Sequence, residues 1–242
     1  MKVAVIIPAA GASKRYGGKG KKIFETIKGQ AVFIKSLELF VNRDDVCQVQ
    51  LVVAPEDMET MKERYAPTIG FMGIKLTAGG ADRTASVRNA LAKVDPQAEL
   101  VCVHDAARPC VSPVWVDAVF AAAARHGSAI LAYPVHGTLK TVGPDGAVDQ
   151  TLPRQAVWEA QTPQVFRREL LLEAYAKAAG PATDDAALVE ALGQKVHVVA
   201  GDARNIKITT RSDLAIAAAV IDTLPKPKPK ATGRGPFDEA QW

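Results

Sequence analysis

The hydrophobic residues of this chain fall into short segments of two kinds, and their order predicts alternating strands and helices. Runs of apolar, mostly β-branched residues predict strands at 3–7, 49–53, 74–77, 100–103, 130–135 and 196–199. Helical spacing or alanine-rich composition predicts helices at 31–41, 56–65, 84–91, 113–125, 168–179, 184–192 and 213–224. Ser212 is the expected N-cap of the last helix. This alternation predicts an α/β fold, with a mostly parallel sheet covered by helices on both faces.

Two stretches depart from the alternation. Residues 141–158 are rich in turn-forming residues and predict a hairpin or extended arm, which we place at about 137–158. Its apolar side chains have no evident core of their own, so a second subunit is expected to cover them. From Pro225 onward lysines alternate with prolines, which predicts a disordered tail over 225–242 behind a domain of residues 1–224. An RNA-binding role for this basic tail is the less favoured alternative.

Composition narrows the class of protein. The 242 residues are 48% hydrophobic and carry a net charge of +4, which favours small anionic ligands over nucleic acid. Three cysteines without a Cys-x-x-Cys pair argue against a disulfide framework and a zinc site, and they suit a reducing cytosol. No apolar signal segment or stretch long enough to span a bilayer occurs, so we expect a cytoplasmic protein without membrane contact.

The loop after the first strand has the composition of a phosphate-binding loop. Pro8 ends the strand, and the small residues at 9–12 let the backbone approach a ligand closely. Ser13, Lys14 and Arg15 follow, and more glycines and lysines lie at 17–22. The spacing excludes both the P-loop and the Gly-x-Gly-x-x-Gly dinucleotide fingerprint. The structural alternative is a tight turn with a solvated basic face.

Three later segments also end or follow strands. Gly79 to Ser86 combines paired glycines with a serine near a helix start, where the alternative is an ordinary capped turn. Asp105 follows a buried strand and could bind Mg²⁺ or a substrate hydroxyl, or merely pair with Arg108. His104 is expected to pack rather than catalyse. The alternation from Asn205 to Thr209 predicts a strand that places Asn205 and Lys207 on one side.

These segments together resemble the 2-C-methyl-D-erythritol 4-phosphate cytidylyltransferase family from Val3 to about Leu224. The most specific match is the run His-Asp-Ala-Ala-Arg-Pro at 104–109, and the loop at 8–15 with Lys22 is the family's signature loop. The resemblance implies a Rossmann-like fold of the nucleotidyltransferase type and a homodimer whose protruding arm crosses to the partner's site. It also implies transfer of CMP from CTP to a small polyol phosphate, 2-C-methyl-D-erythritol 4-phosphate, with release of pyrophosphate. The implied cofactor is Mg²⁺, with Mn²⁺ as the other possible ion.

The resemblance also implies a role for individual residues. The expected catalytic residues are Arg15, Lys22, Arg154 and Lys207. The expected nucleotide-binding residues are Pro8, Ala9, Ala10, Gly11, Ala12, Gly80, Arg83, Ser86, Asp105 and Ala106. The expected binding residues for the sugar phosphate are Asp105, Arg108, Thr138, Arg154, Thr183 and Lys207. Asp105 is the one candidate metal ligand, and the segments at 161–166 and 183–185 are expected to support the site or cap a helix.

The chain departs from the family pattern at two informative places. Lys21-Lys22-Ile23 stands where the family has Pro-Lys-Gln, so Lys21 competes with Lys22 for the catalytic role. Gly137 replaces an aspartate of the arm, which leaves ribitol 5-phosphate open as the acceptor. The alternative of another class is a nucleotide-binding protein without turnover. A role in binding RNA is disfavoured because aromatic residues do not cluster with basic ones.

Overall fold

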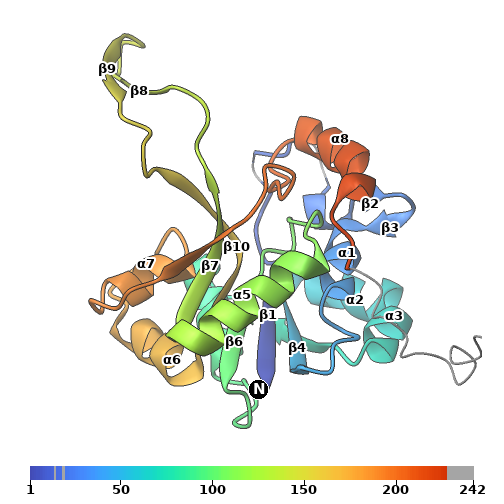
Figure 1. The fold of residues 1–242 in the computed structure, drawn as a ribbon. Helices are drawn as coiled ribbons and strands as arrows, with labels where there is room; N and C mark the ends of the chain where they lie inside the picture. The colour runs from blue at the N-terminus through green and yellow to red at the C-terminus, as the bar shows by residue number, and fades with distance from the viewer. Residues whose placement is uncertain (14, 18–19, 228–242) are drawn as a thin grey trace, which may run out of the picture.

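The protein is built around a twisted seven-stranded sheet, from which a two-stranded arm projects (Figure 1). The computed structural model describes residues 1–13, 15–17 and 20–227; the tail predicted at 225–242 therefore falls mostly outside the described residues. The strands are β1 (Val3–Pro8), β2 (Thr26–Ile27), β3 (Gln30–Ala31), β4 (Val46–Val53), β5 (Lys75–Ala78), β6 (Leu100–Val103), β7 (Ser128–Pro134), β8 (Leu139–Val142), β9 (Val148–Leu152), β10 (Trp158–Arg167) and β11 (His197–Ala200). The helices are α1 (Val32–Glu38), α2 (Met58–Arg64), α3 (Ala66–Phe71), α4 (Arg83–Leu91), α5 (Pro113–His126), α6 (Arg168–Lys177), α7 (Asp185–Glu190) and α8 (Arg211–Val220). Short 3₁₀ turns lie at Lys22–Phe24, Pro55–Asp57 and Ile221–Thr223.

The strand order of the large sheet is β11-β7-β10-β6-β1-β4-β5. β1 pairs in parallel with β4 on one side and with β6 on the other. The strands that follow β1 in the sequence are therefore added first on one side of it and then on the other. In open α/β sheets a ligand crevice forms where the strand order changes side in this way, outside the carboxyl ends of the strands. The topology therefore places the residues that follow β1 and β6 at a ready-made crevice.

The two faces of the sheet carry separate cores, as the alternation of side chains along β1 shows. Val3, Val5 and Ile7 belong to a core that includes residues of α1 and α5. Ile6 points the other way, into a core that includes residues of α4, α6 and α7. Since successive side chains of a strand point to opposite faces, the uninterrupted apolar run of β1 is what a strand buried on both faces requires. The prediction of helices on both faces is confirmed.

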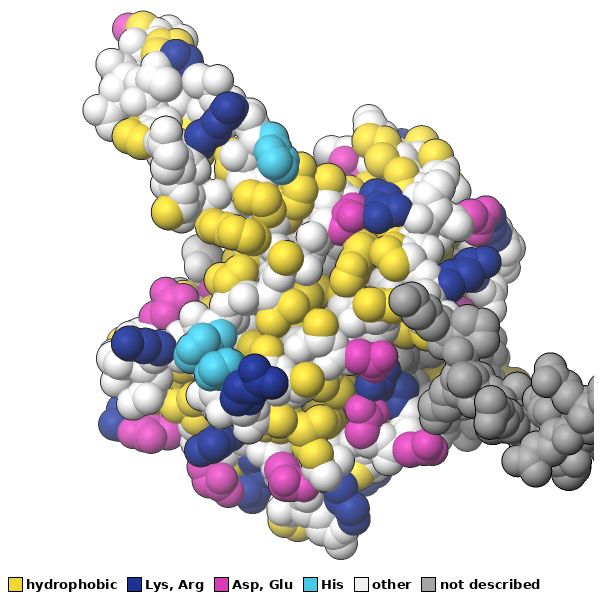
Figure 2. Space-filling view, in the orientation of Figure 1, with side chains coloured by type: hydrophobic (Ala, Val, Ile, Leu, Met, Phe, Trp, Pro, Cys, Tyr) yellow, Lys and Arg dark blue, Asp and Glu magenta, His cyan; other side chains and the backbone are white. Residues whose placement is uncertain are grey.

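The arm consists of β8 and β9, which pair with each other in antiparallel register and form their own small sheet. Figure 2 shows it standing clear of the body of the molecule. Val142 and Val148 on this hairpin are 56% and 58% exposed. The hairpin predicted from turn composition is present, and in the described part of one chain its two valines are mostly exposed, whereas Leu139 and Leu152 are half-buried.

Several local predictions are wrong or incomplete. Residues 205–209 form no strand: Asn205 is fully buried, and its side-chain amide donates to the Thr162 carbonyl at 2.9 Å, whereas Lys207 extends to the crevice. The buried residues of this loop are Asn205 and Ile208, three positions apart, so the loop does not have the alternating burial of a strand. The antiparallel strand β10 and the short helix α3 were not predicted. β10 contains Pro163, which lies where its register with β7 shifts, so local propensity argued against a central strand.

The last helix begins earlier than predicted, and its cap is Thr210 rather than Ser212. The Thr210 hydroxyl accepts a hydrogen bond from the Asp213 amide, and the Asp213 carboxylate accepts from the Thr210 amide, which is a capping box. Ser212 lies inside the first turn. Two hydroxyl residues lie near the start of this helix, and only the backbone conformation decides which of them is outside it. No helix among the described residues is long and apolar enough to cross a membrane.

The corrected cap makes a prediction about stability. We expect Thr210→Ala to lower the free energy of unfolding by about 1 kcal/mol, because the first turn loses its side-chain acceptor. Ser212→Ala is the matched control, and we expect it to change stability by less than about 0.5 kcal/mol. Urea unfolding followed by circular dichroism measures both. A loss at Ser212 as large as the loss at Thr210 would contradict the assignment of the cap.

Candidate active site

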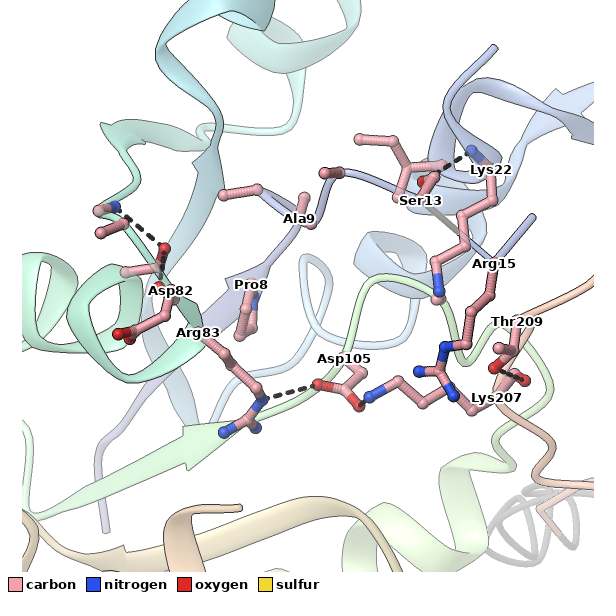
Figure 3. Close-up of a pocket in the computed structure, with 18 residues that line it drawn as sticks. Pro8, Ala9, Ser13, Arg15, Lys22, Asp82, Arg83, Asp105, Lys207 and Thr209 are labelled. Carbon is pink, nitrogen blue, oxygen red and sulfur yellow. Dashed lines mark hydrogen bonds and ion pairs between the residues drawn. The ribbon is translucent and has the colours of Figure 1, made fainter. Parts of the chain in front are cut away.

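A cavity of about 400 Å³ opens at the carboxyl ends of β1 and β6, where the sheet topology predicts a crevice. Residues after β1, after β5 and after β6 meet there with Lys207 from the segment that precedes α8 (Figure 3). It is lined by Pro8, Ala9, Ala10, Gly11, Ala12, Ser13, Arg15, Lys22, Ile23, Gly80, Ala81, Asp82, Arg83, Ser86, Asp105, Ala107, Lys207 and Thr209. Four segments far apart in the sequence thus form one site.

The loop after β1 is shaped by Ser13. The Ala9 amide still donates to the Val52 carbonyl at 2.7 Å, so the sheet holds the start of the loop. Ser13 has a φ of 53°, which is uncommon for a residue other than glycine. Its carbonyl accepts from the Tyr16 amide, and its hydroxyl accepts from the Lys22 amide at 3.3 Å. These hydrogen bonds bring Ser13 and Lys22 together, and both residues line the cavity.

Gly79 allows the segment after β5 to lie against this loop, and Gly80 allows that segment to turn closely onto Ala85 of α4. A Cβ atom at Gly79 would lie 2.6 Å from the Cβ of Ala10. Asp82 caps α4 by accepting from the Ala85 amide at 2.7 Å. The Ser86 hydroxyl accepts from the Gly80 amide at 3.0 Å and donates to the Asp82 carbonyl at 2.7 Å. Ser86 lines the cavity as predicted, but its hydroxyl mainly fixes the turn that precedes α4.

The structure separates the two neighbouring lysines. Lys21 pairs with Glu56 at 2.8 Å and with Asp57 at 2.6 Å, outside the cavity. Lys22 lines the cavity, and in Figure 3 its side chain extends toward Arg15 and Lys207. Burial, and then the positive charge of Lys207 and of Arg15, lowers the pKa of Lys22 to about 8, although Asp105 acts in the opposite direction. A group of cations that destabilise one another's charge is a site prepared for an anion.

Asp105 is the centre of the charge arrangement. Its carboxylate contacts the Lys207 ammonium at 2.6 Å and Nε of Arg83 at 3.3 Å, and Nε of Arg108 lies 3.9 Å away. Burial alone would raise the pKa of Asp105, but Arg83, Lys207 and Arg108 overcome it and hold that pKa well below its usual range. The carboxylate therefore stays charged and orients the cations around it.

A second cavity, of about 250 Å³, shares Arg83, Asp105 and Lys207 with the first. Its other lining residues are Arg108, Ala160, Gln161, Thr162, Gln164, Thr183 and Asp184. Arg108 is 6% exposed, donates to the Asn205 carbonyl at 2.6 Å, and keeps an Nε with no hydrogen-bond partner among the described residues. A buried guanidinium nitrogen without a partner favours an anionic ligand in this cavity.

His104 holds the loop that carries Asp105. The Asp105 amide donates to the Thr162 hydroxyl at 3.1 Å, and that hydroxyl lies 3.0 Å from Nδ1 of His104. Nε2 of His104 lies 3.0 Å from the Arg108 carbonyl. This chain is satisfied when neutral His104 carries its proton on Nε2. Burial lowers the pKa of His104 to about 4, so the ring stays neutral and packs, as expected.

Most of the predicted site residues line the two cavities. Arg15, Lys22, Lys207, Asp105 and the predicted loop residues line the first, and Arg108 and Thr183 line the second. Ala106 is buried and lines neither, whereas Ala107 lines the first. Thr138 and Arg154 are exposed on the arm and line neither cavity of this chain.

Some residues that line the cavities were not among the predicted site residues. Ser13, Asp82 and Thr209 lie within motifs that the sequence singled out, so adjacency to a motif was their only signal. Ile23 had the same signal, because it follows Lys22 in the segment Lys21-Lys22-Ile23. Gln161, Thr162 and Gln164 belong to the segment at 161–166 that was expected to support the site, and together with Ala160 they lie on β10, a strand that was not predicted.

This arrangement can hold two phosphorylated ligands next to each other. Backbone, Arg15 and Lys22 surround the first cavity, and Lys207 stands between the two. The described residues contain no group of three or more His, Cys, Asp or Glu side chains placed to bind a metal. Mg²⁺ commonly binds through one or two carboxylates and the phosphates of its substrate. Asp105 is the carboxylate that lines both cavities, and its two oxygens already contact Lys207 and Arg83, so substrate phosphates would have to supply most of the ligands.

A family model, similar sequences and similar solved structures all carry the same name. The model described as IspD: 2-C-methyl-D-erythritol 4-phosphate cytidylyltransferase matches residues 3–223. A relative of that name from Rhodopirellula baltica is 41% identical over 232 residues, covering 91% of this chain and 95% of the relative. Another, from Pelotomaculum thermopropionicum, is 41% identical over 224 residues, covering 91% and 94%. A crystal structure of the protein of that name from Thermus thermophilus has a TM-score of 0.77 and 36% identity, covering 92% of this chain and 100% of that one. The nucleotidyltransferase-type fold is confirmed.

The lowered pKa of Lys22 predicts that anion binding depends on pH. As the pH rises through about 8, Lys22 of the free protein loses its proton, so the affinity for a polyphosphate should fall. With inorganic triphosphate as the probe, we expect a loss of roughly tenfold between about pH 7 and about pH 9.5 by calorimetry, corrected for ionisation of the probe. Lys22→Arg should remove this fall, because a guanidinium stays charged. Lys21→Arg is the control and should retain it. An unchanged fall in Lys22→Arg would place the titration elsewhere.

Proposed function

The chain belongs to the 2-C-methyl-D-erythritol 4-phosphate cytidylyltransferase family, and from this premise we propose how it transfers CMP from CTP to 2-C-methyl-D-erythritol 4-phosphate. The observation that carries the proposal is the pair of cavities that share Arg83, Asp105 and Lys207. CTP occupies the larger cavity and the acceptor phosphate the smaller one. The shared wall then puts the two reacting phosphates next to each other.

The chemistry is an in-line displacement at phosphorus. An oxygen of the acceptor phosphate forms a bond to the α-phosphorus of CTP, the bond from that phosphorus to the bridging oxygen breaks, and pyrophosphate leaves with the electron pair. The acceptor phosphate is already ionised near neutral pH, so no general base is needed. The barrier comes from the repulsion of two anions and from charge that develops on the leaving group. Positioning and electrostatic stabilisation are therefore the contributions the protein must make.

Each cation has a distinct task in this proposal. Arg15 and Lys22 hold the triphosphate and stabilise the charge that develops on pyrophosphate. Lys207, fixed by Asp105 at 2.6 Å, aims the acceptor phosphate. Each such cation contributes on the order of 3 kcal/mol to lowering the barrier. Arg108, which lines the smaller cavity, adds a further positive charge for the acceptor phosphate.

The small residues of the two loops hold the nucleotide. Pro8, Ala9, Ala10, Gly11 and Ala12 leave the backbone free to approach the phosphates and the ribose. Gly80, Arg83 and Ser86 line the opposite wall, where the turn before α4 faces the base. When bound, Mg²⁺, or Mn²⁺ in its place, neutralises phosphate oxygens, and Asp105 is the protein carboxylate that fits it.

The arm completes the acceptor site of a second subunit. Its hairpin leaves Val142 and Val148 more than half exposed, and an interface would cover them. Thr138 and Arg154 are exposed on this arm and line neither cavity of their own chain. We place them in the partner's acceptor cavity, where Arg154 adds a cation and Thr138 a hydroxyl beside Thr183. The functional unit is thus a homodimer with exchanged arms.

Ribitol 5-phosphate is not favoured as the acceptor, because the family shown is the methylerythritol one. Gly137 lies on exposed backbone, and no described atom lies within 4 Å of where its Cβ would be. Packing within the described chain therefore does not forbid a larger residue there. Three free thiols suit a reducing cytosol, which is where we place the reaction.

Substrate choice is tested by pyrophosphate release. We expect turnover with CTP and Mg²⁺ and not with ATP, GTP or UTP, and the highest kcat/KM with 2-C-methyl-D-erythritol 4-phosphate among polyol phosphates. Faster turnover of ribitol 5-phosphate would overturn the proposed acceptor. Arg15→Ala should reduce kcat by roughly 100-fold or more, so it shows whether the measured pyrophosphate release comes from this site.

The shared site is tested by mixing two inactive variants. Arg154→Ala and Lys207→Ala homodimers should each lose activity, because every site lacks one cation. In a mixed dimer one site has both defects and the other has neither. After random exchange of subunits, activity should return to about one quarter of the wild-type value. Mixing each variant with itself under the same conditions is the control, and no recovery in the mixture would mean that both residues act within one chain.

A further inference from the structure

Asp185 is a buried carboxylate that lines neither cavity yet contacts the site. It lies at the start of α7 and is fully buried. Its Oδ2 accepts a hydrogen bond from Nη2 of Arg83 at 2.6 Å, across 102 positions of sequence. Helix capping does not explain it, because Asp184 accepts the hydrogen bond that caps α7, from the Ala187 amide. A buried charge that serves neither capping nor direct ligand contact needs another reason.

The position of Asp185 is fixed from three sides. Tyr175 of α6 donates its hydroxyl to Oδ1 of Asp185 at 2.5 Å. Gln164 of β10 accepts from the amides of Asp185 and Ala186 at 3.1 and 3.0 Å. The hydroxyl of Tyr175 is held in its neutral form, because burial and the charge of Asp185 both raise its pKa. Both carboxylate oxygens of Asp185 are therefore occupied, and it cannot move toward the cavity without breaking a hydrogen bond.

Arg83 joins this buried carboxylate to the site. Its Nη2 reaches Asp185, and its Nε reaches Asp105 at 3.3 Å (Figure 3 shows the contact with Asp105). Burial would lower the pKa of Arg83, but the charges of Asp185 and Asp105 raise it instead. The contact with Asp185 is the shorter of the two. Asp185 thus holds the guanidinium of Arg83 so that only its Nε contacts Asp105. The other oxygen of Asp105 remains with Lys207 at 2.6 Å.

We propose that Asp185 is a positioning residue for the reaction, which acts through Arg83 to hold Asp105 and Lys207 in place at the wall between the two cavities. The inference rests on the function proposed above. Without the charge of Asp185, Arg83 has Asp105 as its remaining carboxylate partner and can close onto it. Asp105 is then drawn toward Arg83, and Lys207 loses the contact that aims it at the acceptor phosphate. Tyr175 supports the same arrangement by occupying the other oxygen of Asp185.

Asp185→Asn tests this directly, since it keeps the shape and removes the charge. We expect kcat/KM for the acceptor to fall roughly 30-fold, with a raised KM for the acceptor as well as a lowered kcat. Tyr175→Phe should give a smaller loss of the same kind, about threefold, and it also serves as the test if Asp185→Asn does not fold. The control is Ser128→Ala, which removes the buried hydrogen bond from the Ser128 hydroxyl to the Lys195 carbonyl at 2.7 Å, at the start of β7 and outside both cavity linings. Ser128→Ala should lower the melting temperature and leave the KM for CTP and the KM for the acceptor unchanged.

A double-mutant cycle separates positioning from folding. If Asp185 acts through Arg83, then in an Arg83→Lys background the further change Asp185→Asn should reduce kcat/KM by less than about threefold. A purely structural carboxylate would instead lower the active fraction equally in both backgrounds, with no change in KM. Equal losses in the two backgrounds would overturn the proposal.

A measurement without substrate keeps the inference distinct from the proposed function. In the ligand-free wild type, the Nε–H of Arg83 should give a nitrogen–proton NMR signal protected from exchange, assigned by its absence in Arg83→Lys. Asp185→Asn should shift this signal or speed its exchange by about tenfold or more, and Ser128→Ala should not. If the signal is unaltered in Asp185→Asn, the positioning role fails even though the enzyme works. If the signal responds but the wild type does not transfer CMP, the proposed function fails and the coupling of Asp185 to Arg83 stands.

Discussion

The site depends on one electrostatic constraint: a buried carboxylate must stay ionised among cations that would otherwise repel one another. Asp105 satisfies it by contacting Lys207 and Arg83, with Arg108 close by. Burying a lone carboxylate or a lone guanidinium is costly, so Asp105 and the buried Arg108 make each other tolerable, and the partly exposed Arg83 and Lys207 add further countercharge for Asp105. The balance remains positive at the cavity itself, because Arg15 and Lys22 add charge that Asp105 does not neutralise. Burial and, after it, this surplus of positive charge lower the pKa of Lys22, and a phosphate ligand would relieve the surplus.

This constraint explains why so much of the surrounding structure is devoted to holding side chains still. Asp105 lies on a loop clamped by the chain of hydrogen bonds through Thr162 and His104. Arg83 lies at the start of α4, whose cap and preceding turn use both Asp82 and Ser86. Preorganised charges cost little to rearrange when a reaction begins, and this is the usual source of electrostatic catalysis. Much of the polar side-chain chemistry near the cavities therefore stabilises geometry rather than touching a ligand.

The same logic accounts for the arm. A single chain gathers Arg15, Lys22, Lys207 and Arg108 around the cavities, but it leaves Arg154 exposed beside a hairpin whose two valines are more than half exposed. In the dimer that we propose, Arg154 of a second subunit would add its charge to the site only on assembly. The apolar exposure of the hairpin and its basic residue then have one explanation instead of two.

The sequence by itself determined the elements whose information is local. The apolar run of β1, the small residues after it, the glycines at 79 and 80 and the acidic residue after β6 all identify strand ends that line the larger cavity, because a strand, a turn of small residues and a charge are adjacent in the chain. The hairpin of the arm was equally local. Tertiary structure alone decided what depends on distant partners. Lys22 rather than Lys21 faces the cavity because Glu56 and Asp57 hold Lys21 elsewhere. Residues 205–209 are a pinned loop because Asn205 is bonded to β10, and Asp185 reaches the site because α6, α7 and β10 fold it against Arg83. No periodicity or propensity records a contact between residues a hundred positions apart, so these assignments required the folded chain.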